Sequence, residues 1–110
     1  MNNLQRLQLE TKGINLEQNE LMVYLAENGL EAHAEYNPQS MTDKRAIYST
    51  ALSMLESVAN NPTTMKAIKI DDMTVSEFHE NLMKRIDQLT YKVRTMRTDN
   101  SNPDVFMLYV

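Results

Sequence analysis

The chain of 110 residues contains no cysteine, and it has only two glycines and three prolines. Without cysteine it has neither a disulfide framework nor a thiolate metal site. Sandwiches and barrels of β-strands need many turns, which glycine and proline usually make, so their scarcity favours helices. No apolar run approaches the roughly 20 residues that cross a membrane as a helix. We therefore expect a helical protein with no membrane partner.

The composition is that of a single soluble domain. Hydrophobic residues make up 42% and charged residues 24%, which is too apolar for a disordered chain. A chain of this length buries roughly two thirds of the surface that it exposes when unfolded. Most of the nine methionines fall within helical patterns, where their flexible side chains fill gaps in a core. The N-terminal segment MNNLQRLQLETKG lacks the apolar core of a signal peptide, so we expect the protein to be made and kept in a cytoplasm.

Residues 73–97 predict a long amphipathic helix. Its apolar residues recur at steps of three and four, a mean of about 3.5, which places them along one side of a helix. Thr74 and Glu77 have the spacing of a capping box, and Met73 and Phe78 have that of a hydrophobic staple. The predicted seam consists of Val75, Phe78, Leu82, Ile86, Leu89, Val93 and Met96.

Two shorter helices are predicted near the N-terminus. The first, over residues 3–12, ends at Gly13, which readily adopts a left-handed conformation. The second, over residues 16–28, can be capped by Asn15. It is followed by Gly29 and then Leu30, which supplies the apolar contact typical of a helix stop. The first helix carries Leu4, Leu7 and Leu9, and the second carries Leu21, Tyr24 and Leu25.

The middle of the chain predicts a loop and a third helix. Residues 31–41 lose helical periodicity, and a loop of this length is long for a compact bundle. The third helix starts at Ser40 or Thr42 and runs to about residue 60, where Asn60-Asn61-Pro62 ends it. Residues 65–72 predict a brief extended segment before the long helix. The buried face of the third helix is expected at Ile47, Tyr48, Ala51, Leu52, Leu55, Val58 and Ala59.

These patterns predict an all-α fold, a small helical bundle with one long helix in the C-terminal half and an extended C-terminal tail. We assign residues 1–98 to the helical domain and residues 99–110 to the tail. The tail either folds back over the helical core or adds as a β-strand to a partner, and both interpretations remain open. The partner-binding residues in the second interpretation are Val105, Phe106, Met107, Leu108, Tyr109 and Val110.

No catalytic, cofactor-binding or metal-binding residues are predicted. His79-Glu80 begins like a zinc-protease motif, but Met83 stands where the second histidine is required. His33 is more simply a solvated side chain in the loop. The stretch DNSNPD lacks the glycine and the final glutamate of a calcium loop. Since neither glycine belongs to a phosphate-binding loop and no serine has a nucleophile-elbow sequence, we expect no enzyme and no cofactor.

Charge is unevenly distributed along the chain. The first 40 residues hold six glutamates against Arg6 and Lys12, whereas residues 84–97 hold five basic residues against Asp87. Opposite charges on two surfaces suit a head-to-tail ring, in which they determine the register between subunits. Contact with DNA is an alternative, although the net charge is −4 and basic residues stabilise a helix C-terminus by themselves. The predicted subunit-interface residues are Lys84, Arg85, Lys92, Arg94 and Arg97.

The order of the segments resembles that of a known protein family. A short helix is followed by ELMVYLAENGL, a loop with YNP, then KRAIYSTALSMLESVANNP and DDMTVSEFHENLMKRIDQL. This order is similar to that of the small head–tail connector (adaptor) proteins of tailed bacteriophages and prophages. The resemblance covers nearly the whole chain as a pattern of helices, and it makes residues 1–98 the connector domain.

The resemblance implies a structural virion protein without enzymatic activity. Made in the bacterial host cytoplasm, it would assemble beneath the portal protein as a homo-oligomeric ring, twelve-fold in that family. The ring would extend the channel at the head–tail interface and bind tail-side stopper or completion proteins. In that position it could also contact packaged DNA in the channel. Connectors carry a C-terminal segment that docks on the portal; residues 105–110 match it but are shorter.

Two other functions fit the same patterns. The first is a small phage-encoded regulatory or DNA-binding protein that contacts phosphates through the basic end of the long helix. The second is a tail-completion protein or assembly chaperone that uses the long helix as a coiled-coil seam.

Overall fold

The computed structural model describes residues 1–12, 14, 16–61, 63 and 74–96. Apart from an isolated antiparallel bridge between Asn2 and Glu35, regular structure in these ranges is helical. The predicted all-α helical bundle is therefore confirmed. The extended segment predicted at residues 65–72 and the tail predicted at residues 99–110 lie outside the described ranges. The helices are α1 (Asn3–Glu10), α2 (Gln18–Glu27), α3 (Met41–Ala59) and α5 (Val75–Thr95).

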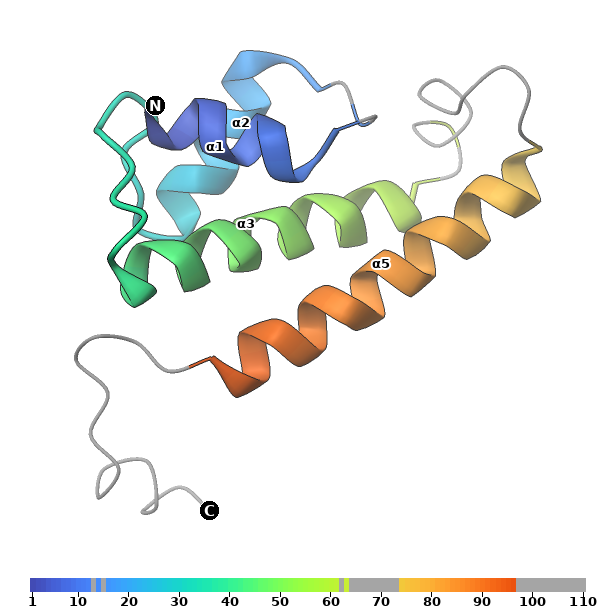
Figure 1. Ribbon diagram of the computed structural model, residues 1–110. Helices are drawn as coiled ribbons and strands as arrows, with labels where there is room; N and C mark the ends of the chain where they lie inside the picture. The colour runs from blue at the N-terminus through green and yellow to red at the C-terminus, as the bar shows by residue number, and fades with distance from the viewer. Residues whose placement is uncertain (13, 15, 62, 64–73, 97–110) are drawn as a thin grey trace.

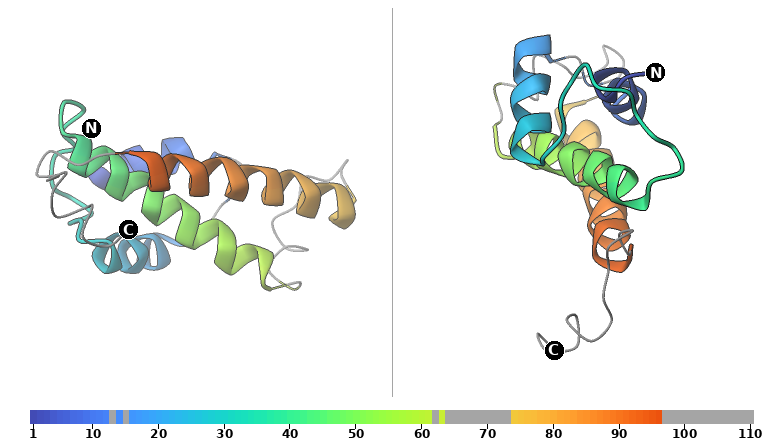
Figure 2. Two further views of the ribbon diagram at one scale, coloured as in Figure 1. Left: turned by 90° about the horizontal axis from the view of Figure 1, so that it is seen from below. Right: turned by 90° about the vertical axis from the view of Figure 1, so that its left-hand side faces the viewer.

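Helix α3 is the central element of the bundle. Helices α1 and α2 pack against it and against each other, while α5 packs along the opposite side of α3 (Figure 1). The end-on view in Figure 2 shows the same order, with α1 and α2 on one side of α3 and α5 on the other. Among the described helices, α5 packs only against α3. The two outer layers are therefore joined chiefly through the central helix.

The buried side chains mostly follow the predicted helical faces, although Tyr48, Leu52 and Ala59 of α3 are half-buried rather than buried. On α5, Phe78, Leu82, Ile86 and Leu89 are buried, while Val75, Val93 and Met96 near its two ends are half-buried. This confirms a narrow seam. On α3 the buried residues also include Thr50, whose hydroxyl donates a hydrogen bond of 2.7 Å to the Ala46 carbonyl. The other buried residues of α3 are Ile47, Ala51, Met54, Leu55 and Val58.

The starts of the two long helices have side-chain caps. The Thr74 hydroxyl accepts a hydrogen bond of 3.0 Å from the Glu77 backbone N–H, and the Glu77 carboxylate accepts one of 3.4 Å from the Thr74 N–H. This capping box confirms the predicted start of α5, and Met73 of the predicted staple lies outside the described residues. Of the two candidates for α3, Ser40 is the cap, since its hydroxyl accepts from the Asp43 N–H.

The end of α2 confirms the predicted stop. Gly29 has a φ of 81°, and the N–H of Leu30 donates a hydrogen bond of 2.9 Å to the Leu25 carbonyl. These are the features of a Schellman motif, which satisfies carbonyls that the helix leaves unpaired. The predicted start at residue 16 is wrong, because α2 begins at Gln18. Its N-cap, Glu17, makes no side-chain capping bond, and Asn15 lies outside the described residues.

Helix α1 is shorter than predicted and buries fewer leucines. It ends at Glu10, and Thr11 follows with its hydroxyl donating to the Leu7 carbonyl at 2.9 Å. Leu4 and Leu7 are buried, but Leu9 is 47% exposed because it lies on the other side of a short helix. Gly13 lies outside the described residues.

The predicted loop after α2 packs closely against α1. The N–H groups of Asn3 and Leu4 donate to the carbonyls of Ala34 and Ala32, at 3.0 and 2.9 Å. Ala32 itself is buried, as is Tyr36 further along. The Asn3 side chain adds a hydrogen bond of 2.8 Å to the Glu31 carbonyl. The N-terminal side of the bundle is thus held by directional backbone bonds as well as by apolar contacts.

Candidate interaction surfaces

Metal-ligating side chains are not clustered within the described residues. No group of three histidine, cysteine or acidic side chains within them lies close enough to hold a metal ion. His33 and His79 are both exposed and far apart in the sequence. The stretch DNSNPD lies outside the described ranges. None of the helices in the described part is long and apolar enough to cross a membrane.

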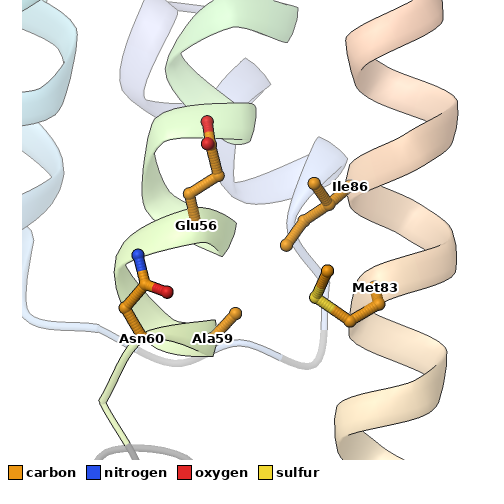
Figure 3. A pocket seen from close by; sticks show the side chains of 5 residues that line it. All are labelled: Glu56, Ala59, Asn60, Met83 and Ile86. Carbon is orange, nitrogen blue, oxygen red and sulfur yellow. The ribbon is translucent and has the colours of Figure 1, made fainter.

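A shallow pocket lies between the end of α3 and the middle of α5. Figure 3 shows Glu56, Ala59 and Asn60 on the α3 side and Met83 and Ile86 on the α5 side. Its volume is about 120 Å³. Sites for small organic ligands usually measure about 300–1,000 Å³ and gather several convergent polar groups. This pocket is smaller than such sites, and Glu56 and Asn60 are the polar residues that line it.

A charged cluster joins α1 to α5 across the bundle. The Glu10 carboxylate is paired with Arg6 one helical turn earlier, at 3.1 Å, and with Arg85 of α5. The Arg6 guanidinium also lies 5.5 Å from the Tyr36 ring centre and 5.8 Å from that of Tyr48. Such distances are those of cation–π contacts. Since α1 and α5 do not pack directly, Glu10 supplies a polar link between the two outer layers.

The surroundings of Arg6 keep it charged. Burial lowers the pKa of its guanidinium, but bonding to Glu10 and Tyr36 and their electrostatic attraction outweigh this, so its pKa lies above the ordinary value. The Arg6 and Glu10 side chains are only 14% and 13% exposed. A buried, paired charge of this kind ties elements together. It does not present a titratable group to a substrate.

The five basic residues predicted for subunit contact fall into three groups. Arg85 pairs with Glu10, and the Lys92 ammonium lies 4.8 Å from the Tyr48 ring centre, so both side chains contact their own chain. Lys84 and Arg94 are exposed and make no ion pair with another described residue. Arg97 lies outside the described ranges. The subunit role of the five stays a prediction, and Lys84 and Arg94 are the two best placed for it.

Exposed acidic side chains lie on both sides of α3, since α5 carries Glu77, Glu80 and Asp87. Helix α2 carries Glu20 and Glu27, both exposed, on either side of Val23, which is 58% exposed. On α5, Tyr91 is 69% exposed and lies between Lys84 and Arg94 in the sequence. Sequence reasoning missed the exposed Val23. Helical spacing was the available signal, since Val23 lies opposite the apolar face of its helix.

The partner-binding residues predicted at 105–110 lie outside the described residues, so their role stays a prediction.

Comparison with family models, with curated proteins and with solved structures gives no match. The case for a function therefore depends on the chain's own residues and on the order of its segments.

Proposed function

We propose that the protein is a structural head–tail connector of a tailed bacteriophage or prophage. In this role it forms a homo-oligomeric ring beneath the portal protein and joins the capsid to tail-side stopper or completion proteins. The resemblance in segment order motivates the proposal, and the all-α bundle is compatible with it. The described residues also include exposed apolar and aromatic side chains, such as Val23 and Tyr91, that are available for contacts between chains.

The observation that carries the proposal is that α3 separates two exposed surfaces of different composition. Helix α2, on one side of the central helix, presents the exposed Val23 between Glu20 and Glu27, whereas α5, on the other side, presents the exposed Tyr91 among residues of both charges. Helices α2 and α5 do not pack together, so these two surfaces do not meet within one copy. A contact between two different surfaces of identical chains, when repeated, gives a closed ring or an open filament.

In the proposed ring, residues 105–110 bind the portal. An apolar segment rich in strand formers can add to the exposed edge of a partner's sheet. Removing Phe106 to Val110 is expected to leave the helical circular dichroism of the chain nearly unchanged and to abolish portal binding. A truncated chain that loses its helical signal would instead assign the tail to the core.

The decisive experiment deletes the encoding gene from the phage or prophage and images the particles. We expect DNA-filled heads without tails, with tailing restored by the protein supplied in trans. In complete virions, electron microscopy is expected to show a ring of this protein at the portal vertex. Normal tailed particles from the deletion strain would refute the proposal.

A DNA-binding function is the second candidate, favoured by the exposed Lys84, Tyr91 and Arg94 on one helix. Against it stand Asp87 on the same helix and the net charge of −4. Duplex binding that weakens steeply between about 50 and 200 mM salt would support it, and no binding at the lower concentration would exclude it. The coiled-coil alternative is less compatible, since the α5 seam is already buried within the chain.

A further inference from the structure

The positive charges around Tyr48 outnumber the carboxylates that pair with them. Arg6 and Lys92 both lie against the Tyr48 ring, 5.8 and 4.8 Å from its centre. Arg85 joins them through Glu10, whose carboxylate pairs with both Arg85 and Arg6. We call Arg6, Arg85 and Lys92 the cationic cluster. Within the described residues, the one carboxylate that pairs with these three cations is Glu10.

The acidic residues of α5 do not balance this excess. Successive residues turn by about 100° around a helix axis, so Glu80 and Asp87, five and two residues from Arg85, point to the other side of α5. Glu77 lies about 12 Å from Arg85 along the axis. Outside α5, Glu35 pairs with the N-terminal ammonium at 3.1 Å. The other residues on the flank of α5 that bears Arg85 and Lys92 are Asn81, Gln88 and Thr95, none of them acidic.

Three side chains on this flank have hydrogen-bond donors to spare. Arg85, Gln88 and Lys92 are spaced three and four residues apart, which aligns them along the helix. The Gln88 carbonyl accepts from Arg85 at 3.4 Å, which leaves the Gln88 NH2 group as a donor. The Lys92 ammonium has three N–H groups, and its contact within the described residues is a ring rather than a hydrogen-bond acceptor. We call Arg85, Gln88 and Lys92 the donor row.

The donor row is accessible and has a buried charge behind it. Gln88 and Lys92 are exposed, and the Arg85 side chain is 35% exposed. The Arg6 side chain is only 14% exposed, and a charge so placed is screened less by salt than one at the surface. Phosphate oxygens are negatively charged acceptors, which arginine binds through its forked N–H groups and lysine as a point charge. The row therefore has the chemistry of a phosphate site.

We propose that the donor row binds a phosphate group on the flank of α5 beside Tyr48. The phosphate accepts hydrogen bonds from Arg85, Gln88 and Lys92 and offsets the positive charge that Glu10 leaves unpaired. The site is complete within one copy of the chain, so the inference does not rest on the connector role. It also differs from the DNA contact considered above, which uses the outward face of α5.

Pyrophosphate, a small and highly charged probe, tests the site. Isothermal titration calorimetry measures its binding to the full chain, with the ionic strength held constant by potassium chloride. Wild type is expected to bind with a Kd of about 1 mM or tighter. The variants R85Q and K92Q each remove one positive donor, and R85Q/K92Q is expected to bind at least about tenfold more weakly.

Lys84 and Arg94 provide the matched control. The variant K84Q/R94Q removes two positive charges from the same helix, at exposed positions that make no ion pair or ring contact with another described residue. Its affinity for pyrophosphate is expected to stay within about twofold of wild type, because exposed charges are strongly screened. K92Q keeps the link from Arg85 to Glu10, so its loss of binding cannot come from a loosened α5. Circular dichroism checks that every variant folds.

A short DNA duplex, titrated in the same way, identifies the source of the phosphate. Duplex binding that R85Q/K92Q weakens and K84Q/R94Q preserves assigns the site to a nucleic-acid backbone, whereas binding of pyrophosphate alone assigns it to a small phosphate compound. The proposal is overturned by a wild-type chain that does not bind pyrophosphate. It is equally overturned by equal losses in the two double variants, which would indicate a general attraction to basic residues.

Discussion

The two sides of α3 are built in different ways. On the side of α1 and α2, backbone groups pair across segments, as in the bond from the Leu4 N–H to the Ala32 carbonyl, and the Ser49 hydroxyl donates to the Asn28 side chain. On the side of α5, a seam of apolar side chains supplies most of the contact. The cross-links there are the bond from the Arg45 side chain to the Val93 carbonyl, the Lys92 contact with Tyr48 and the link from Arg85 to Glu10.

This difference indicates which layer can shift against α3 without losing directional bonds. Hydrogen bonds between backbones are directional, so a shift of one residue breaks several at once. Apolar contacts are not directional, and their strength follows the area removed from water. We therefore expect α5 to open more readily than α1 and α2. In the proposed ring, a helix with that freedom is suited to adjust to a neighbouring copy.

The largest expected effect comes from the α5 seam. Leu89→Ala removes a side chain with 0% exposure and is expected to lower the free energy of unfolding by about 2–5 kcal/mol. Leu7→Ala, at an equally buried site on α1, is the matched change. Urea denaturation gives the losses, and hydrogen exchange is expected to show faster opening confined to α5 in Leu89→Ala. Equal acceleration in α1 and α5 would remove the distinction between the layers.

The next effect comes from the carboxylate that links the layers. Glu10→Gln leaves the buried Arg6 charge without its counter-charge and is expected to cost about 1–3 kcal/mol. Arg85→Gln retains the pair of Glu10 with Arg6, and Arg85 is 35% exposed, so a smaller loss is expected. Denaturation of both variants and of the double variant measures the coupling. A cost for Arg85→Gln equal to that of Glu10→Gln would contradict this order.

A smaller loss of stability is expected at the C-terminal end of α2, on the other side of α3. An added Cβ at Gly29 meets nothing within 4 Å, so Gly29→Ala tests the φ of 81° alone. The left-handed conformation costs a residue with a side chain about 1–2 kcal/mol. Gly29→Asn is expected to lose less, because asparagine visits this conformation more readily. Thermal denaturation compares the two, and equal stability of wild type and Gly29→Ala would contradict the assignment.

The smallest effect is expected at the helix caps. Thr74→Ala removes the hydroxyl that caps α5 and is expected to cost about 1 kcal/mol, whereas Thr74→Ser retains the bond. Ser40→Ala is the matched change at α3. If α5 opens independently, Thr74→Ala increases hydrogen exchange in α5 and leaves α3 unchanged. An unchanged exchange pattern would show that α5 opens only with the whole protein.

The features that sequence predicted well are those encoded within a few residues. The capping box at Thr74 and the stop at Gly29 each involve neighbouring positions, so their residue types are sufficient. The start of α2 was placed wrongly because its N-cap, Glu17, makes no capping bond and leaves no local signal. The exposure of Leu9 likewise follows from where α1 packs.

Contacts between residues far apart in the sequence were even harder to predict at the interaction surfaces. The run of basic residues in α5 was recognised from the sequence, but nothing along the chain shows that Arg85 meets Glu10, 75 residues earlier. The contact of Lys92 with Tyr48 is equally long-range. Sequence therefore identified the basic residues of α5 but not the groups that they contact. Only the packing of the helices shows that Lys84 and Arg94 are left exposed on that helix.

The central position of α3 has a consequence for biosynthesis. The ribosome releases α1, α2 and α3 before α5, so the surface that α5 covers meets water, or a chaperone, while synthesis continues. Until α5 has emerged, the face of α3 that receives its apolar seam therefore lacks the helix that covers it in the finished protein.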